Sequence, residues 1–232
     1  MIVCHFVFFR IAARPADRAS EADLARLTAH LRATPALRKA HIHTASPEAI
    51  RGPFAGDERA PALALQLYYD RIEDLEAPIL AGGHLQGLAQ CLPSLAGARI
   101  THQAMVVRPF PVPPAGARTP TRCSYLVHYP GAAADMNAWL RHYVTHHPQL
   151  MFDLPGIREI EIYTRLDWCD DVPWERATAM QRNKVVFDSP AALAASLVSP
   201  ALGPMRADYH AFPPFTGANV HYPMITTTLA PA

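Results

Sequence analysis

The stretch PFPVPPAGARTP, residues 109–120, decides how the chain is organised. Its prolines exclude a helix and a central strand, so the stretch is expected to form a stiff, extended spacer. It divides the 232 residues into two parts of similar length. We therefore expect an N-terminal unit over 1–108, a linker over 109–121 and a C-terminal unit over 122–232.

The two units repeat one pattern of apolar residues. Each begins with a β-rich run, continues into an amphipathic helix, and follows it with two strands, a second helix and a last strand. Ser20 and Asp135 stand where the two long helices begin, as N-caps do. Asp70 and Asp188 are expected to open the second helices. The expected strands are Ile2–Phe9, a run ending near Thr44, 63–70 and 100–107, and then Cys123–Tyr129, a run ending near Thr164, 183–188 and 219–226.

The order strand–helix–strand–strand–helix–strand, present twice, predicts an α+β protein made of two ferredoxin-like βαββαβ units. Helices cover one face of each antiparallel sheet and leave the other face bare. Because half of the residues are hydrophobic, the bare faces are expected to pack together. The sequence thus predicts an intramolecular α/β barrel with a cavity between the two sheets.

The composition excludes several classes of protein. Half of the residues are hydrophobic, 18% are charged and the net charge is +1, which argues against a disordered chain and against a nucleic-acid partner. No apolar run reaches the length of a membrane span, and residues 1–9 lack the features of a signal peptide. The four cysteines form no CxxC pair, which is typical of reduced thiols. We expect a cytoplasmic protein with no membrane partner.

Motifs for the common cofactors are absent from the sequence. It contains no GxGxxG, GxxxxGK[ST] or GxSxG motif, and only Lys39 and Lys184 could form a Schiff base. His142 and His146 have the i, i+4 spacing of a metal-binding pair, but no compact third ligand follows them. We therefore expect no cofactor and no metal, and acid–base chemistry in a dry pocket remains.

A family resemblance is carried mainly by the second half. The runs that carry it are YLVHYP (125–130), WLRHYVTHHPQLMFDLPGI (139–157), VVFDSPAALAASLVSP (185–200) and DYHAFPPFTGANVHYPM (208–224). These runs resemble the EthD family of the dimeric α/β-barrel superfamily, whose members include isomerases, polyketide cyclases, monooxygenases and haem-handling enzymes. The resemblance covers 122–226 closely and is only architectural over 1–108.

The resemblance also implies which half is active. The family's histidine, two residues before a proline, maps onto His146 before Pro148. The stretch matched to it in the first half, Ala33-Thr34-Pro35, has the proline and no histidine. This difference implies an active second half and a scaffold first half, with His146 as the general acid/base. A structural alternative is that His146 only caps the end of its helix.

Further candidate residues come from the strands and loops of the second half. We expect His221 to be a second catalytic residue, and we expect substrate contacts from Tyr125, His128, Tyr129, His147, Tyr222 and Trp168. Strand alternation separates Tyr125 and Tyr129 from His128, and His221 from Tyr222, and leaves open which face meets the cavity. Trp168 opens a loop that could cover the cavity mouth. Asp208 is more typical of a solvated carboxylate.

These observations favour a cofactor-independent lyase or isomerase acting on a small aromatic or polyketide-like substrate. The expected reaction is a decarboxylation, dehydration or carbon–carbon cleavage with proton transfer by histidine. Two alternatives stay open: a cofactor-free monooxygenase of aromatic compounds, and a non-catalytic binding or partner subunit of a catabolic oxidation system. A homodimer built on the internal pairing is also left open.

Overall fold

The computed structural model describes residues 1–11, 18–46, 60–113 and 121–230. The first half contains β1 (Val3–Arg10), α1 (Glu21–Arg32), β2 (Lys39–Ala45), β3 (Leu63–Tyr69), α2 (Ile72–Glu76), the 3₁₀ helices η1 (His84–Cys91) and η2 (Pro93–Leu95), and β4 (Arg99–Phe110). The second half contains β5 (Thr121–Tyr129), α3 (Met136–Met151), β6 (Glu159–Arg165), β7 (Glu175–Arg176), β8 (Gln181–Phe187), α4 (Pro190–Ser196), α5 (Leu202–His210) and β9 (Val220–Leu229).

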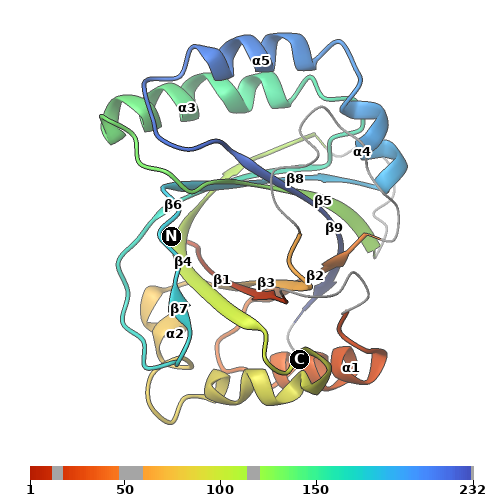
Figure 1. Cartoon of the computed structure of the whole chain (residues 1–232), viewed down its shortest axis with the longest axis vertical. Helices are drawn as coiled ribbons and strands as arrows, with labels where there is room; N and C mark the ends of the chain where they lie inside the picture. The colour runs from red at the N-terminus through yellow and green to blue at the C-terminus, as the bar shows by residue number, and fades with distance from the viewer. Residues whose placement is uncertain (12–17, 47–59, 114–120, 231–232) are drawn as a thin grey trace.

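The strands close into one antiparallel barrel, with the helices of the two halves on opposite sides of it (Figure 1). Each half has the ferredoxin-like strand order, β4-β1-β3-β2 in the first and β9-β5-β8-β6 in the second. The halves join where β2 pairs with β9 and β4 pairs with β6. The two-residue strand β7 adds a short parallel pairing to β4. The predicted α+β barrel of two facing ferredoxin-like sheets is confirmed.

Strand alternation sorts the buried side chains into three apolar clusters. One cluster lies under the helices of the first half, one lies under the helices of the second half, and one lies inside the barrel. The long helices begin where the sequence predicts, because the side chains of Ser20 and Asp135 accept hydrogen bonds from the backbone N–H groups of Asp23 and Ala138. The second helix of the second half begins behind Ser189 rather than Asp188.

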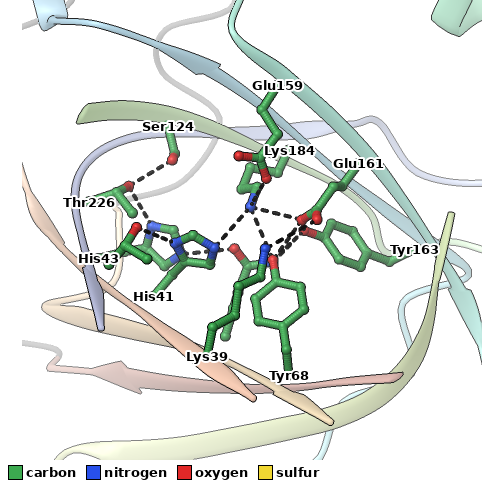
Figure 2. Close-up of polar contacts among 12 residues, drawn as sticks. Lys39, His41, His43, Tyr68, Ser124, Glu159, Glu161, Tyr163, Lys184 and Thr226 are labelled. Atoms are coloured by element: carbon green, nitrogen blue, oxygen red, sulfur yellow. Dashed lines mark hydrogen bonds and ion pairs between the residues drawn. The ribbon is translucent and has the colours of Figure 1, made fainter. Parts of the chain in front are cut away.

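A hydrogen-bonded polar cluster occupies one end of the barrel interior, between the two sheets (Figure 2). Lys184 is fully buried, and its Nζ lies 2.8 Å from both Glu159 Oε1 and Glu161 Oε2. Tyr68 and Tyr163 donate hydrogen bonds to Glu161, and Lys39 Nζ lies 3.6 Å from it. Burial alone would raise the pKa of Glu161, but the two lysines lower it to about 2. Two lysines and two glutamates therefore balance each other at this end of the barrel.

Two proline positions differ from the sequence prediction. Pro109 lies in β4 opposite Glu161, so the strand extends two residues into the expected linker. A proline carbonyl can still accept a hydrogen bond, and the missing N–H is tolerated at the end of a strand. Pro148 lies inside α3, which continues to Met151 instead of breaking. Residues 114–120 of the expected linker lie outside the described residues.

The helix ends show which residues of the two halves correspond. Thr34-Pro35-Ala36-Leu37-Arg38 and Leu154-Pro155-Gly156-Ile157-Arg158 form the same turn, with positive φ at Ala36 (55°) and Gly156 (78°). After the turn, the backbone N–H of Arg38 donates to the carbonyl of Tyr68, and that of Arg158 donates to the carbonyl of Val186, each at 2.8 Å. Pro35 therefore corresponds to Pro155, and its expected match to Pro148 is wrong.

Among the helices of the described ranges, none combines the length and the apolar character that crossing a membrane requires.

Candidate active site

A cavity of about 260 Å³ lies between the second-half sheet and its covering helices, on the outer side of the barrel. Its walls come from β5, β8 and the start of β9 on one side and from α3, α4 and α5 on the other. Most of the wall is apolar. The lining residues are Tyr125, Val127, Tyr129, His147, Met151, Leu154, Asn183, Val185, Phe187, Leu193, Leu197, Leu202, Met205, Arg206, Tyr209, His210, Asn219 and His221.

His147 and Asp208 form a hydrogen-bonded pair at the helix side of this cavity. His147 is 6% exposed on α3, and its Nδ1 lies 2.8 Å from Oδ2 of Asp208 on α5. The other carboxylate oxygen of Asp208 lies 2.8 Å from His142 Nε2. Because an ionised carboxylate only accepts hydrogen bonds, Nδ1 of His147 carries the proton and Nε2 carries the lone pair.

The environment keeps the imidazole of His147 neutral. Burial lowers its pKa, and the hydrogen bond to Asp208 opposes that effect without reversing it. Nε2 has no hydrogen-bond partner among the described residues. A neutral imidazole whose proton is fixed on Nδ1 by a carboxylate can take a proton from a bound molecule at Nε2.

The sheet side of the cavity supplies the other polar groups. The rings of Tyr125 and His221 stack with centroids 5.2 Å apart, and Asn219 Nδ2 lies 3.3 Å from His221 Nε2. Burial lowers the pKa of His221 to about 4, so its ring is neutral as well. Asn183 is buried and donates to the hydroxyl of Tyr143 at 2.5 Å, while its Oδ1 has no partner among the described residues. These groups can hold an oxygen substituent of a bound molecule.

The structure brings together four of the eight residues expected at the site: Tyr125, Tyr129, His147 and His221. His128 and Tyr222 lie on the same strands but point into the barrel, since alternate residues of a strand face opposite sides. They do not line this cavity. Trp168 packs against the first-half cluster, with its ring 5.8 Å from that of His102. Trp168 therefore does not line this cavity.

His146 does not reach the cavity. Its side chain is exposed on α3, and its Nδ1 lies 2.9 Å from the backbone carbonyl oxygen of His142. Successive residues of a helix point about 100° apart, so His146 and His147 cannot face the same wall. The sequence predicts that His146 lies at the active site, but the histidine of α3 that lines the cavity is His147.

Asp208 and Asn183 are site residues that the sequence reasoning did not single out as functional. Asp208 lies far from His147 along the chain, and only the packing of α5 against α3 brings them together. Asn183 lies in β8, and the sequence does not show which face of that strand its side chain is on. In the part of the chain that the structure describes, no three His, Cys, Asp or Glu side chains are grouped so that they could hold a metal ion.

Comparison with known proteins supports the fold. No protein-family model matches the chain, and no curated protein sequence matches it. Among solved structures, an anthrone oxidase-like protein is similar with a TM-score of 0.65 at 12% identity, over 99% of this chain and 92% of that one. A candidate monooxygenase from Fusobacterium nucleatum has a TM-score of 0.59 at 6% identity, over 100% and 95%.

The EthD resemblance has a partial structural counterpart. An EthD family protein from Bacillus halodurans aligns with 42% of this chain and 95% of its own length, at 16% identity and a TM-score of 0.34. That score is too low to carry an argument about family or function. The assignment of the second half to the EthD family therefore stays a prediction.

Proposed function

We propose that the chain is an enzyme that removes a proton from a small aromatic or polyketide-like substrate. The substrate binds in the cavity between the second-half sheet and its covering helices, called the helix-side cavity below. The observation that carries this proposal is the pair His147–Asp208, which places at an apolar cavity an imidazole Nε2 that has no partner among the described residues. Asp208 fixes the tautomer and stabilises the imidazolium that forms after proton transfer. The hydroxyl of Tyr125 and the side-chain N–H groups of Asn219 can donate to the oxygen on which negative charge develops.

The reaction we favour is a cofactor-free oxygenation. His147 takes a proton from an activated methylene group, and the resulting carbanion transfers electrons to dioxygen to form a C–O bond. Return of a proton gives a hydroperoxide, which loses water and leaves a carbonyl, so that CH₂ and O₂ become C=O and H₂O. Support for this choice comes from the neighbours of the same fold, which are named as an anthrone oxidase-like protein and a candidate monooxygenase.

The cavity fits this chemistry in size and polarity. About 260 Å³ is near the lower end of ligand pockets and suits a small polycyclic molecule better than a large cofactor. The apolar walls exclude water, which strengthens the few polar contacts and protects a carbanion from protonation. The same dyad would serve a lyase or isomerase, in which the proton step is not followed by oxygen uptake.

Oxygen consumption by the purified protein with anthrone as the probe tests the proposal. We expect one O₂ to be consumed per quinone formed, at a rate that falls sharply in His147→Ala. Turnover of an aromatic substrate under strictly anaerobic conditions would instead show the lyase or isomerase. Binding of aromatic molecules without turnover in either condition would show a binding subunit.

A further inference from the structure

The two ends of the barrel interior differ in charge balance. At one end Lys39 and Lys184 face Glu159 and Glu161, as described above (Figure 2). At the other end lies Arg182, two residues before Lys184 on β8 and therefore on the same inward face. Arg182 is only 4% exposed, which is rare for an arginine without a charged partner.

The partners of Arg182 are all neutral. Its Nε and Nη2 donate to Oε1 of Gln103, at 3.2 and 2.9 Å, and its Nη1 lies 2.6 Å from Nδ1 of His128. The rings of Phe6 and Phe8 lie beside the guanidinium, with centroids 5.4 and 4.9 Å away. No carboxylate of the described residues is within ion-pair distance of it. Burial lowers the pKa of Arg182 to about 9, so the group stays charged at neutral pH.

His128 adds an unsatisfied donor at the same place. Arginine only donates hydrogen bonds, so Nδ1 of His128 must accept the bond from Arg182, and the ring proton is on Nε2. That Nε2 is buried and has no partner among the described residues. The ring is fixed between Phe8 and Tyr222, each with its centroid 5.1 Å away. A buried N–H without an acceptor costs free energy, which a ligand oxygen would recover.

An open cavity of about 640 Å³ has both Arg182 and His128 among its lining residues. Its inner wall consists of Phe8, Val220 and Tyr222 together with Arg182 and His128. Arg10 also lines it and donates to the hydroxyl of Tyr222 at 2.9 Å. At the rim, Glu175 is held by Arg99 through two contacts of 2.8 and 2.5 Å. Among the described residues, the lining thus contains three arginines and one glutamate.

We propose that this open end of the barrel binds an organic carboxylate, whose oxygens accept from Arg182 and from Nε2–H of His128. Three of the five guanidinium N–H groups are used by Gln103 and His128, which leaves two for a ligand. A planar carboxylate matches the planar guanidinium and neutralises its single charge. Phe8, Tyr222 and Val220 offer an apolar surface to the organic part of the ligand, which a hydrated inorganic ion would not use.

This site is separate from the helix-side cavity. The two cavities lie on opposite faces of β5, β8 and β9, and the two sets of lining residues have no member in common. The inference therefore does not depend on the proposed oxygenation.

Isothermal titration calorimetry with benzoate, benzamide and inorganic phosphate tests the site. We expect benzoate to bind the wild-type protein with a Kd below about 1 mM, and the neutral benzamide and phosphate to bind at least about tenfold more weakly. Arg182→Gln should weaken benzoate binding by about 10- to 100-fold, because it removes the charge and the fork of donors. Equal binding of benzamide, preferred binding of phosphate, or no binding of benzoate overturns the proposal.

Arg206→Gln is the matched control, because Arg206 is an arginine that lines the other cavity. Benzoate affinity should not change in this variant, and a loss comparable to that in Arg182→Gln would place the probe in the helix-side cavity and refute the site. If Arg182→Gln fails to fold, His128→Phe gives the second test. It keeps the ring packing against Phe8 and Tyr222 and removes Nε2–H, so an unchanged benzoate affinity would refute the site as well.

Discussion

Leu27 of α1 occupies the place in the first half that His147 of α3 occupies in the second, counting back from the shared turns at Pro35 and Pro155. Leu27 is fully buried in the apolar cluster under the first-half helices, whereas His147 borders a cavity and contacts Asp208. One fold thus carries an apolar side chain in one half and a titratable one in the other. This difference favours chemistry in the second half.

Replacing His147 by alanine should lower kcat by about 10²–10⁴-fold, the usual loss when a general base is removed. The neighbouring His146→Ala should keep near wild-type turnover, because that side chain is exposed and bonded to its own helix. Steady-state kinetics of both variants, with circular dichroism to verify folding, checks this pair. A loss in His146→Ala alone would return the catalytic role to His146.

Changing Asp208 to asparagine should lower kcat and shift the acid limb of the pH–rate profile to lower pH. The carboxylate raises the pKa of His147 against the effect of burial, so its removal lowers that pKa further. A base must be neutral to act, and activity therefore persists to lower pH while the rate at the plateau falls. His142→Gln leaves the His147–Asp208 contact in place and removes a neighbouring group that lowers the pKa of His147, so the limb should move in the opposite direction, to higher pH. An unmoved limb in Asp208→Asn would show that the carboxylate is only structural.

Replacing Lys184 by methionine should destabilise the fold by about 3–5 kcal/mol, because breaking a buried ion pair leaves an uncompensated charge. The charges left behind are those of Glu159 and Glu161, and only Glu161 keeps a second cation, Lys39 at 3.6 Å. Arg38→Met, which breaks the exposed pair with Asp70, should cost less than about 1 kcal/mol. Urea unfolding of both variants measures the two values, and similar costs would contradict the argument.

The protein should lose stability as the pH falls from about 6.5 towards 3, and His43 should contribute to the slope. His43 is fully buried between Thr226 and Gln66, and burial, assisted by Lys184, lowers its pKa to about 3. Between these pH values His43 is protonated in the unfolded chain and neutral in the folded chain. Its contribution to the free energy of unfolding is therefore complete above the unfolded pKa and is lost as the pH falls below it.

His43→Gln should flatten this dependence by up to about 1.4 kcal/mol per pH unit, the value for one proton, while keeping polar contacts to both neighbours. The exposed His146→Gln serves as the matched control for the loss of a histidine. The free energy of unfolding measured by urea at several pH values between 4 and 7 decides the matter.

The sequence by itself determined the order of the elements and the barrel of two halves. These features depend on local signals, namely the alternation of apolar residues, the caps at Ser20 and Asp135, and the repeat of one pattern. The sequence also predicted four of the cavity residues, because strand and helix positions can be counted along the chain. These residues are Tyr125, Tyr129, His147 and His221.

Only the tertiary structure decided which face of each strand meets which cavity, because alternation gives two faces and does not label them. In the structure, His128 and Tyr222 face the barrel interior and His146 is exposed on the surface. The tertiary structure also brought Asp208 to His147, and Arg182 to His128, through contacts between segments far apart in sequence. Burial and hydrogen-bond partners set the charge and the proton position of each of these groups, and both arise only when distant segments pack together.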